Sequence, residues 1–129
     1  MKSIIFILLV VFATFNAQSH ELQCFIHDLP WGENLIESQI YQTQLDKNIV
    51  INLKHDLIEA NFLIEPIHAK NIINFSIKAK EVVNSEEGFY QIDISKVKPN
   101  VKFNMGAVYT ELTGVGDTTA SSCWIKLKQ

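Results

Sequence analysis

The feature that most constrains the fold is an alternation of apolar and polar residues with a period of two. It is clearest between residues 71 and 83. The apolar positions there are Ile73, Phe75, Ile77 and Ala79, with polar residues between them. A period of two places successive side chains on opposite faces of a β-strand, so this segment predicts a strand with one buried face.

The same alternation recurs in six further segments that are separated by turn-forming residues. These segments are 21–27, 49–54, 61–67, 89–95, 101–111 and 121–128. Residues 33–45 are less regular and fit a loop with either a short strand or a helical turn, and residues 56–60 fit a helical turn. About seven short strands with one apolar face predict an all-β protein, an antiparallel β-sandwich.

Two of these segments, 101–111 and 89–95, allow more specific predictions. In segment 101–111 one face is expected to point inward and Gly106 to mark a β-bulge. The inward residues on this reading are Val101, Phe103, Met105, Ala107 and Tyr109. In segment 89–95 Tyr90 is expected to point inward. Residues 84–88, just before it, are expected to form a turn.

The first residues have the form of a secretory signal peptide. Met1-Lys2-Ser3 supplies a positive charge, and residues 4–13 are ten consecutive apolar residues. Small and polar residues follow, as is typical of a cleavage region. A membrane anchor needs about 18 or more apolar residues and is not favoured. We expect residues 1–17 to be removed; cleavage after Ser19 is the alternative and would leave His20 at the N-terminus.

The remaining residues, 18–129, are expected to form one secreted domain without stable insertion into membranes. This part has 10 Lys and no Arg against 14 acidic residues. Nucleic-acid binding depends on clustered positive charge, so the composition argues against it.

The only two cysteines lie near the two ends of this domain. Cys24 shares a strand face with Ile26, and Cys123 shares one with Ile125. Two cysteines in a secreted chain favour a disulfide; the alternative is two free, buried thiols. A bond would tie the first predicted strand to the last and enclose 98 residues.

The sequence contains no pattern that indicates catalysis. There is no Gly-x-Ser-x-Gly, Cys-x-x-Cys, His-Glu-x-x-His or phosphate-loop motif. Four histidines, His20, His27, His55 and His68, are interpreted as ordinary surface residues. The alternative is a copper-type nitrogen site built on an N-terminal His20 and a second histidine. We predict neither an enzyme nor a cofactor or metal site.

Asn74-Phe75-Ser76 is the only N-glycosylation sequon in the chain. The alternation directs Asn74 outward while Phe75 points to the core. If the source is a eukaryote, we expect a glycan on Asn74.

The last third of the chain carries a family resemblance. The residues concerned are Gly88-Phe89-Tyr90-Gln91-Ile92-Asp93-Ile94, then Val97-Lys98-Pro99-Asn100-Val101-Lys102-Phe103, then Cys123-Trp124-Ile125. This region resembles the ML lipid-recognition family, which includes the lysosomal cholesterol carrier lost in Niemann–Pick type C disease and the group-two dust mite allergens. The chain departs from the family in lacking four further cysteines and in having Asn84-Ser85-Glu86-Glu87 in place of a Cys-Pro motif.

The resemblance implies an immunoglobulin-like sandwich whose sheets splay to hold a lipid or sterol, in the extracellular space or the endolysosomal lumen. It also implies a bond between the terminal cysteine and one near the mature N-terminus, a role that Cys24 fits. We expect the ligand to contact Phe75, Ile77, Tyr90, Phe103, Met105 and Tyr109. The turns 98–100 and 66–68 are expected to form the mouth. The alternative is a secreted recognition protein with a solid core and no small-molecule ligand.

Overall fold

The structure is a computed structural model that describes residues 19–29, 34–111 and 118–128. The expected signal peptide, residues 1–17, lies outside the described residues. Within the described part of the chain, no helix has the length and apolar character needed to cross a membrane.

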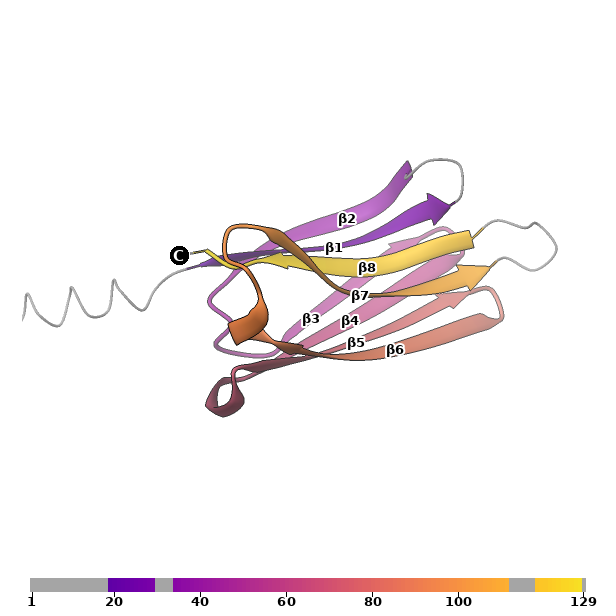
Figure 1. Ribbon diagram of the computed structural model, residues 1–129. Coiled ribbons are helices and arrows are strands. Elements are labelled where there is room, and N and C mark those ends of the chain that lie inside the picture. Colours follow the sequence, from indigo (N-terminus) through magenta and orange to yellow (C-terminus); the bar gives the residue numbers. More distant parts are fainter. Residues whose placement is uncertain (1–18, 30–33, 112–117, 129) are drawn as a thin grey trace, which may run out of the picture.

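Eight antiparallel strands form two sheets of four, which lie face to face as two layers (Figure 1). The first sheet has the order β2-β1-β8-β7 and the second β3-β4-β5-β6. The strands are β1 (His20–Leu29), β2 (Asn34–Thr43), β3 (Ile49–His55), β4 (Ile58–Ile67), β5 (Ile72–Glu81), β6 (Asn84–Asp93), β7 (Lys102–Glu111) and β8 (Thr118–Lys126). Two short 3-10 helices, η1 (His68–Lys70) and η2 (Ile94–Lys96), follow β4 and β6. The predicted all-β sandwich is confirmed, with eight strands rather than about seven.

The additional strand is β2, in a region that we expected to be mostly loop. It pairs with β1 along its whole length at the edge of the first sheet. Its pattern is obscured because apolar residues occupy both faces: Ile40 is 57% exposed, while Tyr41 packs against the core.

Two turns also differ from expectation. Residues 56–60 form no helical turn, because Asp56 and Leu57 close a tight β3–β4 hairpin and β4 begins at Ile58. Residues 84–88 are not a turn but the first half of β6. The chain reverses earlier, at Val82 and Val83, and Val82 takes a left-handed φ of 57°.

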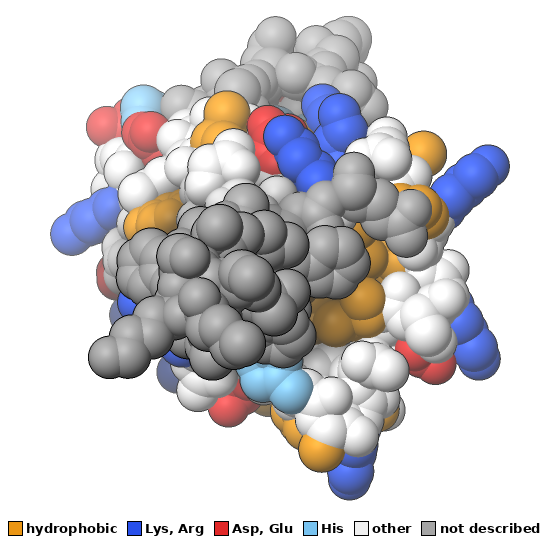
Figure 2. All heavy atoms as spheres, turned by 90° about the vertical axis from the view of Figure 1, so that its left-hand side faces the viewer, with side chains coloured by type: hydrophobic (Ala, Val, Ile, Leu, Met, Phe, Trp, Pro, Cys, Tyr) orange, Lys and Arg blue, Asp and Glu red, His pale blue; other side chains and the backbone are white. Residues whose placement is uncertain are grey.

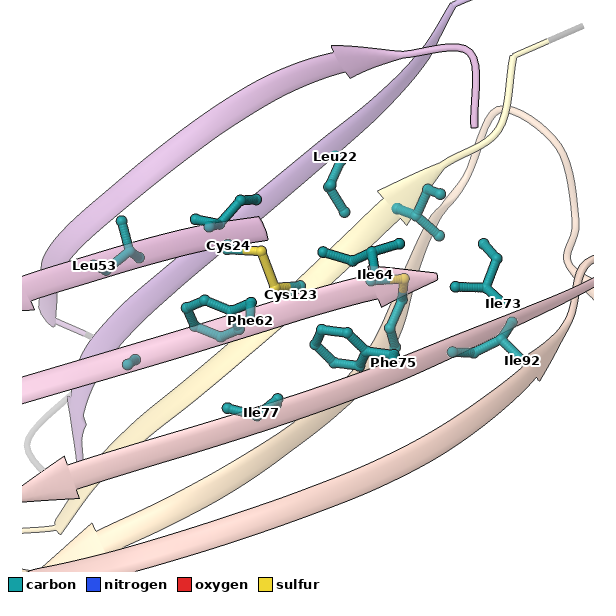
Figure 3. Close-up of a cluster of buried hydrophobic side chains, with 14 of the residues drawn as sticks. Leu22, Cys24, Leu53, Phe62, Ile64, Ile73, Phe75, Ile77, Ile92 and Cys123 are labelled. Carbon is teal, nitrogen blue, oxygen red and sulfur yellow. A yellow bond between two sulfur atoms is a disulfide. The ribbon is translucent and has the colours of Figure 1, made fainter. Parts of the chain in front are cut away.

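The core lies between the sheets and surrounds a disulfide (Figure 3). Cys24 and Cys123 stand directly opposite each other on β1 and β8, with a Cα–Cα distance of 4.0 Å, and neither is exposed to solvent. The predicted bond between the first and last strands is therefore confirmed. Phe62 and Phe75 from the second sheet stack beside it, with ring centroids 6.4 Å apart.

The β7 strand contains the expected bulge, with a consequence that the sequence analysis missed. The pairing of β7 with β8 shifts between Asn104 and Gly106. Such a shift moves every following side chain to the other face. Val108 and Thr110 therefore face the core, whereas Tyr109 is 55% exposed. The expected inward orientation of Tyr109 and of its neighbour Ala107 is wrong.

Gly106 itself is required by a close approach. The ring of Tyr90 packs so tightly on it that a Cβ at position 106 would lie 2.4 Å from two ring carbons. The Tyr90 hydroxyl also donates a hydrogen bond to the carbonyl of Ala107. Tyr90 therefore links the β6 and β7 edges of the two sheets.

Candidate ligand-binding site

A pocket of about 440 Å³ opens between the two sheets at one end of the sandwich. This is the end where β1 begins and β8 finishes, at the left of Figure 1. The pocket is lined by His20, Gln44, Leu45, Pro66, Ile67, His68, Asn71, Ile94, Ser95, Val97, Pro99, Leu127 and Lys128. We call it the end pocket.

The segments around the pocket are tied together through the backbone. After η1, Asn71 adopts a left-handed conformation with φ 53°, and its carbonyl accepts a hydrogen bond from the Ile94 N–H at 2.8 Å. The Asn100 N–H donates to the carbonyl of Leu127 at 2.6 Å. These two bonds hold the β4–β5 connection to η2, and the turn before β7 to the end of the chain.

The pocket has an apolar floor and a polar rim. Leu45, Val97 and Leu127 belong to the core cluster and are at most 8% exposed. Figure 2 looks onto this end of the molecule, where hydrophobic side chains are visible just right of centre and others lie nearer the edge. The ionisable lining residues are His20, His68 and Lys128, and none of the lining residues is acidic. The site therefore suits an apolar ligand whose head group is neutral or negatively charged.

His20 is held in one tautomer at this rim. Its Nδ1 accepts a hydrogen bond from the Lys128 N–H at 3.0 Å. An imidazole that accepts through Nδ1 and is neutral must carry its proton on Nε2. Burial lowers the pKa of His20 from its usual value of 6.5, which favours this neutral form.

Asp93 stands beside the pocket but is engaged with its own turn. Its Oδ1 accepts hydrogen bonds from the hydroxyl and the N–H of Ser95, at 2.6 and 3.0 Å. The bond from the Ser95 hydroxyl lowers the pKa of Asp93, because it stabilises the carboxylate. The carboxylate thereby caps η2.

The structure separates the residues expected to contact the ligand. Phe75, Ile77 and Met105 are buried in the core, and Tyr90 packs against it. Phe103 is 38% exposed and Tyr109 faces outward. None of the six lines the end pocket.

Residues of both segments expected to form the mouth do line the end pocket. They are Pro66, Ile67, His68 and Pro99. Pro66 and Ile67 end β4 rather than forming a turn, and they meet the turn at Pro99 at one opening. The sequence analysis missed the floor residues. Leu45 lies two residues after β2 and Leu127 directly after β8, so their signal was an apolar side chain just beyond a strand.

The opposite end of the sandwich buries polar side chains, and Thr110 there also lines a surface hollow of about 700 Å³. Glu81, at the end of β5, is 5% exposed and accepts a hydrogen bond from the Thr110 hydroxyl at 3.0 Å. Thr119, paired with Thr110, is also buried. The buried hydroxyl of Ser121 has no hydrogen-bond partner among the described residues. We call Glu81, Thr110, Thr119 and Ser121 the polar end.

The described residues contain no group of three His, Cys, Asp or Glu side chains arranged to hold a metal ion. Comparisons of the chain with protein-family models, with curated proteins and with solved structures found no match.

Proposed function

We propose that the protein is a secreted carrier that binds a lipid or sterol, with the apolar part of the ligand in the end pocket. The observation that supports this most directly is the pocket itself. It lies between the edges of two sheets, has a floor of buried aliphatic side chains and a rim of polar ones. Small-molecule sites typically combine an apolar lining with a few polar groups that fix orientation.

The size of the pocket suits part of a lipid. Its volume of about 440 Å³ falls in the range usual for small-molecule sites. Each methylene group that leaves water contributes about 0.8 kcal/mol, so burying about ten of them would contribute about 8 kcal/mol, the free energy of a micromolar Kd, before the entropy cost of association. The floor leads directly to Leu22 and the other core residues, which a longer ligand would have to displace.

The proposal also draws on the resemblance of the last third of the chain to the ML family. That family holds lipids between two sheets. The proposal assigns no catalytic reaction to the protein.

The test uses protein purified gently from the medium of secreting cells. Organic extraction and mass spectrometry should recover a lipid or sterol in a molar ratio near one. The stripped protein should then take up fluorescent fatty acid or sterol. If no lipid is extracted and neither probe binds, the carrier proposal fails and the surface-recognition alternative takes its place.

A further inference from the structure

A row of side chains crosses the outer face of the second sheet. Val50, Leu63, Ser76 and Phe89 stand opposite one another on β3, β4, β5 and β6 in successive pairs. Val50 is 70% exposed and Phe89 is 76% exposed. The row lies in a groove of about 310 Å³. We call these four residues the apolar row.

The rows on either side are polar, so the apolar row is an isolated stripe. On one side Lys78 pairs with Glu87 at 3.7 Å. On the other side Asn74 lies opposite Gln91. In Figure 1 no described element covers this outer face. Val50 and Phe89 therefore expose apolar surface on a face that is otherwise polar.

The glycosylation sequon lies on this stripe. Ser76, its third residue, is a member of the apolar row, and Asn74 points to the same face two positions away. Asn74 is a diagonal neighbour of both Leu63 and Phe89. Diagonal neighbours in a sheet are about 7–8 Å apart, within reach of a large group.

The folded structure can also accommodate a substituent on the Asn74 side-chain nitrogen. Gln91 Nε2 donates to Asn74 Oδ1 at 3.3 Å, so this contact holds the amide by its oxygen. The glycan attaches to the nitrogen, Nδ2. Asn74 is half-buried rather than covered, which leaves room for a substituent.

We propose that Asn74 carries an N-linked glycan whose first sugar lies over the apolar row, against Phe89. The bond forms between Nδ2, which loses a proton, and C1 of the sugar, which leaves a lipid pyrophosphate carrier in the secretory pathway. One face of an N-acetylglucosamine ring carries mainly C–H groups, so it removes aromatic surface from water when it packs on a ring. The glycan, rather than a protein partner, then covers the apolar row. This inference does not depend on ligand binding in the end pocket.

The test combines Asn74→Gln with Phe89→Thr, in protein secreted from eukaryotic cells. Intact mass should show one glycan, absent from Asn74→Gln. Loss of the glycan should lower the thermal midpoint by about 2–4 °C and raise the fluorescence of a dye that binds apolar surface. Trimming the glycan to its first sugar should retain the midpoint. In the Phe89→Thr background, Asn74→Gln should shift the midpoint by less than about 1 °C.

The matched control is Val83→Thr, which alters an 80% exposed residue in a hairpin outside the row. In the Val83→Thr background, Asn74→Gln should still lower the thermal midpoint by the full amount. Three results would overturn the proposal. These are an unmodified Asn74, an effect of Asn74→Gln that is the same with and without Phe89, or self-association of the glycosylated chain that Phe89→Thr abolishes.

Discussion

The described residues at the two ends of the sandwich bury different kinds of side chain. At one end the buried side chains are aliphatic, as at Leu45 and Leu127, and a pocket opens above them. At the other end Glu81 and Thr110 turn polar groups inward and bind each other. Both ends belong to the same two sheets, so the difference comes from the residues at the strand ends. Among the described residues, the side chains at the strand ends, rather than the sheet architecture, distinguish the two ends.

The disulfide lies between the two ends and should stabilise both. Replacing Cys24 by Ser opens the loop of 98 residues between the two cysteines, so we expect a loss of about 3–5 kcal/mol in the free energy of unfolding. Urea unfolding measures this value. Cys123→Ser should give a similar loss; a loss below about 1 kcal/mol in both variants would contradict the account.

Stability should fall when one partner of the hydrogen bond at the polar end is removed. It should largely recover when both partners are replaced by apolar residues. Thr110→Val leaves the buried Glu81 carboxylate without its hydroxyl partner, which should cost about 1–3 kcal/mol of stability. The double variant Glu81→Leu with Thr110→Val should recover most of that loss. Ligand uptake should be unchanged in both, because the polar end is remote from the end pocket. Reduced ligand uptake in a folded variant would contradict the proposed difference between the two ends.

Ligand uptake should fall when a larger side chain fills the end pocket. Val97 lines the pocket, and Val97→Phe would place a larger side chain in its space. We expect uptake of lipid to fall at least about tenfold, equivalent to about 1.4 kcal/mol, in a protein that still unfolds cooperatively. Ala107→Phe is the control, since Ala107 lies opposite Ser122 on the outer face of the first sheet. Equal loss of uptake in both variants would count against this site.

The smallest expected effect concerns His20 at the pocket rim. Burial lowers its pKa in the folded protein below the value of 6.5 that holds when it is unfolded. The unfolded chain therefore binds a proton first, and stability falls as the pH drops through about 6.5. His20→Asn should weaken the difference in stability between pH 7.5 and 5.5. An identical pH dependence in the two proteins would show that His20 has no part in it.

Much of the fold could be predicted because the inward faces of β3, β4 and β5 alternate without interruption. Ile73, Phe75 and Ile77 are each 1% exposed, as their period of two indicated. Edge strand β2 was missed because its two faces differ little in polarity. The hairpin at Val82 carries no turn-forming residue, so nothing in its composition marked it.

The candidate site was harder to predict than the fold. The Gly106 bulge was recognised, yet alternation was continued through it, and this placed Tyr109 on the wrong face. The end pocket combines residues from five separate segments, and their proximity depends on how strands pair. Only the two mouth segments were visible locally, because Pro66 and Pro99 mark them.

The most direct test of the central claim is to map where a ligand binds. A fatty acid and a sterol, each bearing a photoreactive diazirine in its apolar part, are added to the secreted protein, irradiated and located by peptide mass spectrometry. We predict adducts within residues 66–71, 94–99 and 127–128, which unlabelled lipid suppresses. Adducts confined to the polar end or to the outer faces of the sheets, or no adduct that unlabelled lipid suppresses, would contradict the account.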